Sequence, residues 1–288
     1  MNNYVIFADT GADISTVKLA EWGVKLCPLT FAFEGEDKSY AGGDMPVKEF
    51  YDRMRAGGVA HTSAMNIETA KSLFIPELEQ GNDVLYLVFS SGLSSTYSSA
   101  RTAAEELMEE YPERKIVVVD SLSASAGHGL LLLLAVRKKR EGADIDEVAK
   151  FCEDIRLNVC HWFTVDDLVY LKRGGRVSAT AAIAGAILGI KPVLHVDDDG
   201  HLINMLKVRG RKASIKALAD KYGELHKDDM DETVFISNGD CEEDAKLLAD
   251  MLKERYNVKT ELITDIGPVI GAHSGPGTLA LFFIGEHR

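Results

Sequence analysis

Three short apolar runs constrain the fold most strongly, because each leads into a polar turn and then into a helical pattern. The runs are Tyr4–Ala8, Val84–Phe89 and Ile116–Val119. Runs of this length, rich in β-branched and aromatic residues, are typical of buried strands. Strands that alternate with helices form a parallel sheet with helices on its faces. We therefore predict an α/β fold with a parallel sheet in an N-terminal domain, residues 1–157.

The second half of the chain has a different pattern. A predicted helix over Asp146–Leu157 leads into it, and Lys191–Val196 and His201–Lys207 are predicted strands joined by an Asp-rich turn. Such a hairpin is antiparallel, so we predict a C-terminal α/β domain, residues 158–288, with a mixed or antiparallel sheet. A run of small residues over Ala179–Gly189 predicts a helix that packs closely against a neighbour.

Hydroxyl side chains gather in three segments, Thr62–Ser63, Ser90–Thr96 and Ser121–Ser125. Each segment on its own fits a helix N-cap. The last two also follow predicted strands, and ligands of parallel sheets bind beyond the carboxyl ends of the strands. Converging hydroxyls, together with the backbone N–H groups of helix N-termini, would form a pocket that suits a carboxylate or a phosphate.

Glycine and proline are most concentrated near the end of the chain, in the segment GPVIGAHSGPG at Gly267–Gly277. Glycine lets the backbone approach a ligand closely, and proline fixes φ. We predict a turn here that places His273 against a small polar group. The alternative is a plain connection between predicted strands at Asp265–Ile270 and Thr278–Ile284.

The chain has more acidic than basic residues, and this excess argues against some classes of binding partner. A formal net charge of −13 argues against nucleic acid or an anionic membrane as the main partner. The four cysteines form no CxxC pair, no secretory signal precedes Tyr4, and we expect a cytoplasmic protein. The longest apolar run, Leu130–Val136, is too short for a membrane span. P-loop, GxSxG and metal-ligand spacings are absent from the sequence.

Seven segments are distinctive in combination: HTSAMN, VFSSGLSSTYSSA, VVDSLSASAGHG, LVYLKRGGRVS, ILGIKPVL, KVRGRK and GPVIGAHSGPGTLAL. Their order and spacing, from Asp9 to Leu281, resemble the DegV family of bacterial fatty-acid-binding proteins. The resemblance implies two α/β domains around one long-chain fatty acid, such as palmitate, and a carrier rather than an enzyme. It also implies a partner, the fatty acid kinase, which phosphorylates the bound acyl carboxylate with ATP. The carrier then takes the acyl phosphate towards phospholipid synthesis, and no other cofactor is implied.

Functional residues of the family carry over onto matching positions of this chain. The resemblance implies that the carboxylate is held by Thr62 and Ser94, with Ser63, Ser95 and His273 beside them. It links two arginines, Arg176 and Arg209, to productive engagement with the kinase. Two departures stand out: the usual TSQPS is TSAMN here, and Ser95 replaces a usual glycine beside the head-group position.

Two other functions remain open from the residues alone. A serine esterase or acyl-phosphatase would use Ser94 as nucleophile and His273 as base, with Asp265 or Asp120 as the third group of a triad. A sensor of a carboxylate or phosphate metabolite would use the same hydroxyls. For the fatty-acid carrier we expect an acyl slot lined by apolar side chains, for which the sequence suggests Leu93, Ala124, Ile183, Ile187 and Leu188.

Overall fold

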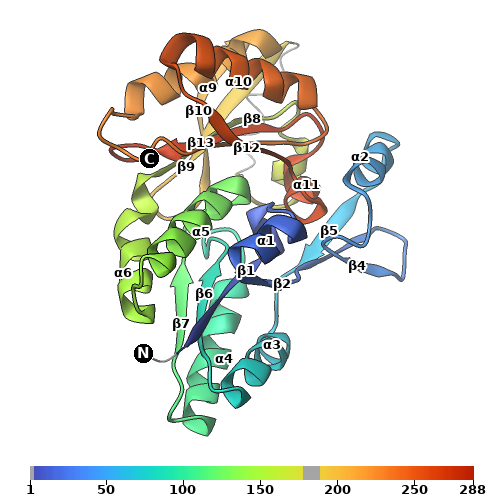
Figure 1. Ribbon diagram of the computed structural model, residues 1–288. Helices are drawn as coiled ribbons and strands as arrows, with labels where there is room; N and C mark the ends of the chain where they lie inside the picture. The colour runs from blue at the N-terminus through green and yellow to red at the C-terminus, as the bar shows by residue number, and fades with distance from the viewer. Residues whose placement is uncertain (1–2, 178–188) are drawn as a thin grey trace.

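The computed structural model describes residues 3–177 and 189–288, and its main feature is a pair of β-sheets with a helix between them (Figure 1). The first sheet has four parallel strands in the order β2-β1-β6-β7. This four-stranded sheet confirms the predicted parallel sheet. Its strands are β1 (Tyr4–Asp9), β2 (Val24–Cys27), β6 (Asp83–Val88) and β7 (Ile116–Asp120).

The second sheet has six strands in the order β10-β9-β8-β13-β11-β12. Only β11 and β12 pair in parallel among these described strands, so the sheet is mixed, as predicted. The strands are β8 (Val159–Thr164), β9 (Ile190–Val196), β10 (Leu202–Arg209), β11 (Val234–Asn238), β12 (Thr260–Asp265) and β13 (Leu279–Ile284). The sheets thus draw on separate parts of the chain, and the domain boundary between residues 157 and 158 stays a prediction.

Helix α5 (Ser125–Arg140) lies between the two sheets (Figure 1). Every residue from Ser125 to Val136 is buried, and one apolar core joins α5 to side chains of both sheets, including Leu85 and Phe282. Four basic residues in its last turn lie where the helix dipole favours positive charge. The helix is therefore a shared wall of both halves.

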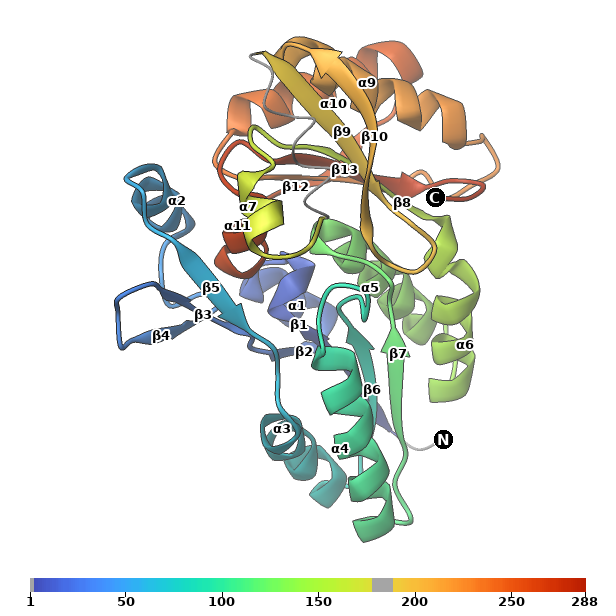
Figure 2. The same ribbon diagram turned by 180° about the vertical axis from the view of Figure 1, so that it is seen from behind.

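Other helices cover the outer faces of the sheets, as the view from behind shows for α4 and α9 (Figure 2). Helices α3 (Ile67–Glu79) and α4 (Thr96–Glu110) pack against each other and against the four-stranded sheet, and α9 (Arg211–Leu225) and α10 (Glu242–Tyr256) cover the six-stranded sheet. Further helical segments are η1 (Thr10–Ala12), α1 (Thr16–Trp22), α6 (Ile145–Ile155), η2 (Arg156–Asn158) and α7 (Val169–Arg173). No helix among the described residues is long and apolar enough to span a bilayer.

A small third sheet was not predicted. The segment Val24–Phe33 forms two strands, β2 and β3 (Thr30–Phe33), which are separated around Pro28. Proline has no backbone N–H to donate to a neighbouring strand, and the chain leaves the four-stranded sheet at Pro28. Strand β3 pairs with β4 (Ser39–Ala41) and β5 (Ala60–Ser63), and α2 (Val47–Arg55) packs on them. Strand β5 carries Thr62, so this excursion positions a predicted site residue.

The segment GPVIGAHSGPG also differs from its prediction. Pro268–Ser274 forms a helix, α11, rather than a turn, with Pro268 in the first helical position and Gly275 after the last, at φ 79°. Proline is well suited to the first position because its missing N–H has no intrahelical partner there. The helix predicted over Ala179–Gly189 lies almost entirely outside the described residues, which resume at Gly189.

Candidate functional site

A cavity of about 280 Å³ lies between the two halves of the molecule. Hydroxyl and imidazole groups line one part of it, from Thr62, Ser63, Ser94, Ser95 and His273. We call these five residues the hydroxyl end. All five come from the predicted head-group set, so the fold brings together β5, the turn before α4 and α11, which lie far apart in the sequence.

Thr62 and His273 form the central contact of the hydroxyl end, with 2.8 Å between Thr62 Oγ1 and His273 Nε2. Ser94 has a different partner. Its Oγ lies 2.9 Å from Thr96 Oγ1 and accepts the Thr96 backbone N–H at 3.2 Å. Ser63 and Ser95 are exposed, so the hydroxyl end reaches the surface of the protein.

His273 is held as a neutral ring. Burial lowers its pKa to about 4, and the positive charges of Arg176 and His61 act in the same direction. Its Nδ1 is buried and finds no hydrogen-bond partner among the described residues. Gly174 lies directly against this nitrogen, where a Cβ would collide with the ring. The role of Gly174 could not be predicted from the sequence, because it depends on a contact between α11 and the end of α7.

Arg176 lines the cavity and ties the two halves together. Its Nε and Nη2 both donate to the carbonyl oxygen of Leu93, at 3.2 and 2.9 Å, and its Nη1 donates to the Gly174 carbonyl. Desolvation lowers its pKa from the usual arginine value. Arg209 lies elsewhere: it is exposed at the end of β10 and is not among the lining residues. Of the two arginines linked to the kinase, Arg176 is among the residues that line the cavity and Arg209 is not.

The rest of the cavity wall is mainly apolar. It includes side chains from both halves: Leu29, Phe89, Phe163, Leu171, Val196, Leu202, Val269 and Phe282. Two of the residues suggested for an acyl slot, Leu93 and Ala124, are among the lining residues. The other three, Ile183, Ile187 and Leu188, lie outside the described residues. A cavity that combines these hydroxyl and imidazole groups with mainly apolar walls suits an amphipathic ligand better than a small polar metabolite.

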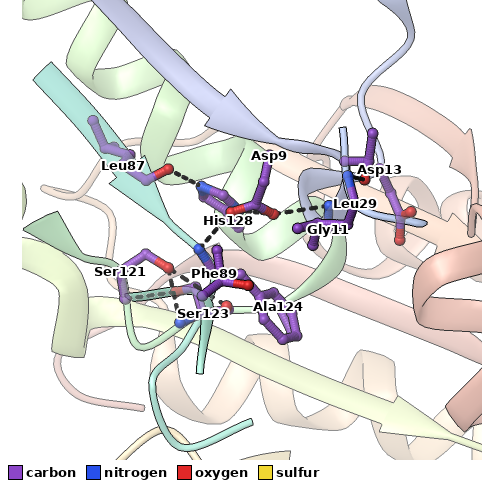
Figure 3. A network of polar contacts seen from close by, with 12 residues as sticks. Asp9, Gly11, Asp13, Leu29, Leu87, Phe89, Ser121, Ser123, Ala124 and His128 are labelled. Carbon is purple, nitrogen blue, oxygen red and sulfur yellow. Dashed lines mark hydrogen bonds and ion pairs between the residues drawn. The ribbon is translucent and has the colours of Figure 1, made fainter. Parts of the chain in front are cut away.

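A buried carboxylate fixes the turns beside this cavity (Figure 3). Asp9 accepts the backbone N–H groups of Gly11 and Phe89, each at 2.9 Å, and the Tyr86 hydroxyl at 3.3 Å. It thereby caps η1 and holds the end of β6 next to β1. His128 contacts the Leu87 carbonyl oxygen at 3.1 Å through Nε2. This network explains how the chain can place the Ser90–Thr96 turn at the edge of the parallel sheet.

A second buried carboxyl, that of Asp13, joins three segments at the cavity wall. It accepts the Ser125 hydroxyl at 2.6 Å and the Gly267 backbone N–H at 2.8 Å. Ser125 Oγ also lies 2.9 Å from Ser237 Oγ on β11. Burial raises the pKa of Asp13 to about 8, despite the two hydrogen bonds, which act in the opposite direction. Helix α1 is capped by Ser15 and not by Asp13.

Two glycines let the halves approach closely beside the hydroxyl end. Ser90 Oγ donates to the Gly200 carbonyl oxygen at 2.9 Å. A Cβ on Gly92 would lie 2.7 Å from the Asp199 carbonyl oxygen. The turn between β9 and β10 therefore packs directly on the turn before α4.

The groups that a hydrolytic triad would need are bonded elsewhere. Asp265 accepts a hydrogen bond from Asn238, and Asp120 accepts the backbone N–H groups of Ser91 and Leu122. Within residues 3–177 and 189–288, no carboxylate bonds to His273 Nδ1, and Ser94 is paired with Thr96. A search of the same residues for clusters of His, Cys, Asp and Glu that could hold a metal ion found none.

Comparisons with known proteins identify the family. A family model described as "Uncharacterised protein, DegV family" matches residues 3–286. The chain belongs to the DegV family. A DegV domain-containing protein of Clostridium perfringens is 41% identical to this chain over 289 residues, covering 100% of the chain and 99% of the relative.

Solved structures of DegV proteins share the fold. A DegV lipid-binding protein of Thermotoga maritima has a TM-score of 0.85 and 32% identity, covering 99% of each chain. A stearic-acid-binding protein of Eubacterium ventriosum has a TM-score of 0.89 and 27% identity, covering 98% of each chain. The expected DegV fold is thus confirmed, and these DegV neighbours are described as binding lipid or fatty acid.

Proposed function

We propose that this DegV protein binds one long-chain fatty acid in the cavity, with its carboxylate at the hydroxyl end and its hydrocarbon tail along the apolar wall. The observation that carries the proposal is the composition of the cavity, in which neutral hydrogen-bond donors meet apolar side chains such as Phe163 and Phe282. The fatty acids bound by related DegV proteins support the same ligand class.

The energetics of such a complex are favourable. Each methylene removed from water contributes about 0.8 kcal/mol, so a long acyl chain contributes more than about 10 kcal/mol in gross terms. Association costs about 4–15 kcal/mol in lost freedom, and the burial of an unpaired carboxylate would cost several kcal/mol more. Hydrogen bonds from Thr62 and Ser94 would offset the second cost, which is why we assign the head group to the hydroxyl end.

The neutral ring of His273 gives Thr62 a defined role in the proposal. A carboxylate accepts hydrogen bonds only, so Thr62 must direct its own hydrogen towards the ligand. The contact between Thr62 Oγ1 and His273 Nε2 then has the ring N–H as donor. We infer that His273 orients the threonine hydroxyl rather than acting as a general base.

The second part of the proposal is presentation of the bound carboxylate to a fatty acid kinase. The kinase would transfer a phosphoryl group from ATP to a carboxylate oxygen, giving acyl phosphate and ADP, and the DegV protein would carry the product towards phospholipid synthesis. Ser63 and Ser95 are exposed beside the head-group position, which supports access from the surface. Arg176 and Arg209 are the proposed kinase-linked residues, with Arg209 the better exposed of the two.

Mass spectrometry of extracted ligand tests the binding proposal. We expect the purified protein to carry a long-chain fatty acid at about one molecule per chain. Thr62→Val should weaken binding of added palmitate by about 10- to 100-fold, because a hydrogen bond to a charged group is worth about 1.5–3 kcal/mol. Thr102→Val is the matched control, since Thr102 on α4 donates to Ser98. Protein without fatty acid that also fails to bind palmitate would refute the proposal.

Arginine variants test the kinase step separately. We expect Arg209→Ala to slow kinase-dependent acyl phosphate formation while bound lipid is retained, because Arg209 lies outside the cavity lining. Arg176→Ala should slow the same reaction. An equal loss of bound lipid in the Arg176 variant would show that its contact with Leu93 closes the cavity and would contradict the kinase role. The measurement is phosphorylated product per molecule of loaded carrier.

A further inference from the structure

One hydroxyl that lines the cavity belongs to none of the residues assigned above. Ser274, the last residue of α11, is only 5% exposed. Its Oγ is buried and finds no hydrogen-bond partner within the described parts of the chain. A buried hydroxyl without a partner destabilises a protein, because the group has lost its water. The position of Ser274 is therefore better explained by a ligand than by packing.

Three other polar side chains on the cavity wall, those of Ser125, Thr278 and His161, differ from Ser274 in this respect. Ser125 is bonded to Asp13 and Ser237, as described above. Thr278 donates to the carbonyl oxygens of Ser274 and Gly275, each at 2.9 Å. His161 forms a hydrogen bond through Nδ1 with the Val159 carbonyl oxygen, at 2.8 Å. These groups are satisfied by the protein itself, whereas the Ser274 hydroxyl remains free to donate to a ligand.

The place of Ser274 in the chain indicates which part of a ligand it would meet. It follows His273 directly, and consecutive Cα atoms lie about 3.8 Å apart. Both His273 and Ser274 line the cavity, and His273 contacts Thr62 at the hydroxyl end. It approaches from α11 at the end of the chain, while Thr62 and Ser94 come from the first hundred residues.

We propose that Ser274 is a further head-group residue, whose hydroxyl donates to the carboxylate of the bound acid; this inference rests on the proposed function. A carboxylate has two oxygens and about four sites that accept hydrogen bonds. Thr62 and Ser94 leave part of that capacity unused. The Ser274 hydroxyl donates to one of these unused sites from the half of the molecule opposite Thr62 and Ser94. The carboxylate then links the two halves, and the site selects an acid over an uncharged analogue of equal length.

Binding of palmitate and of hexadecanol to Ser274→Ala tests the proposal. We expect the variant to bind palmitate about 10- to 100-fold more weakly, the range expected for a hydrogen bond to a charged group, and hexadecanol less than about threefold more weakly. Ser274→Cys keeps a side chain of similar size with a weak donor, so it should lose most of the same affinity. The ligand-free Ser274→Ala protein should melt no lower than wild type, because the lost hydroxyl has no partner in the protein. Ser214→Ala is the control: Ser214 is buried on α9, bonds to the Arg211 carbonyl oxygen, and should leave both affinities unchanged.

The outcomes separate this inference from the function on which it rests. If wild type binds palmitate and Ser274→Ala binds it equally well, Ser274 is not a head-group residue and the proposed function stands. Equal losses for palmitate and hexadecanol would show a packing role and would also overturn the inference. A wild-type protein that fails to bind palmitate would overturn both.

Discussion

The buried carboxyl of Asp13 makes the stability of this protein depend on pH in a defined direction. In the folded protein its pKa is raised from 3.8 to about 8. The folded state therefore holds one more proton than the unfolded state between these two values. The free energy of unfolding must fall as pH rises through that window, by up to about 1.4 kcal/mol per pH unit. Between pH 5 and pH 8 the fall from this one group is roughly 3.5 kcal/mol.

Asp13→Asn should remove that dependence. An asparagine has the shape of a protonated aspartate, so its oxygen can accept the Gly267 N–H and its NH₂ can donate to Ser125. We expect wild type and variant to have similar stability near pH 5, with the variant the more stable at pH 8. Three titratable groups influence Asp13 or share its surroundings, namely Asp9, Asp265 and Tyr51. None of them changes in the variant, so the difference between the two proteins reports Asp13.

Urea unfolding followed by circular dichroism at pH 5, 6, 7 and 8 is the assay. Asp83→Asn provides the control, because Asp83 is also buried but accepts the Lys115 N–H at 2.9 Å and lies 3.8 Å from Arg114. That variant should lose stability, because it removes the charge that faces Arg114. Parallel profiles for wild type and Asp13→Asn would refute the reasoning, because they would mean that Asp13 ionises alike in both states.

Two further predictions concern the cavity and its rim. Gly92→Ala places a Cβ 2.7 Å from the Asp199 carbonyl oxygen, so urea unfolding should show a loss of about 1–3 kcal/mol; an unchanged value would mean that the two turns part easily. The His273 ring should remain neutral down to about pH 5 in an NMR titration, because its pKa is lowered to about 4; an inflection above pH 6 would contradict its burial.

The convergence of Thr62, Ser94 and His273 on one cavity was predictable only in part. Apolar runs followed by polar turns predicted the parallel sheet, because that pattern is local and periodic. The placement of the Ser90–Thr96 turn at the carboxyl edge followed from the same rule. Thr62 and His273 were linked to this edge by the family resemblance, since nothing in their local sequence specifies a contact across more than two hundred residues.

Features that depend on tertiary contacts could not be predicted. The break at Pro28 divides the segment Val24–Phe33 between two sheets, and hydrophobic pattern alone does not show where a chain changes sheet. Helix α11 is seven residues long and contains glycine, so its local sequence favours a turn. In the folded protein, Asp13 and Tyr51 form hydrogen bonds with Gly267 and Ile266, the two residues that precede the helix. The roles of Gly174 and Ser274 arise only from what lies opposite them in the fold.

The enclosure of α5 by both sheets limits how a ligand can enter and leave. A hinge that swung the halves apart as rigid bodies would strip one sheet from a helix whose residues Leu130–Leu134 are at most 7% exposed. Each leucine uncovered would cost about 1.5–3 kcal/mol, so a rigid separation would approach the whole stability of a typical domain. Exchange of the proposed acyl ligand would therefore be confined to local displacements at the rim of the cavity. The barriers there are a few hydrogen bonds, such as those from Arg176 to Leu93 and from Ser90 to Gly200.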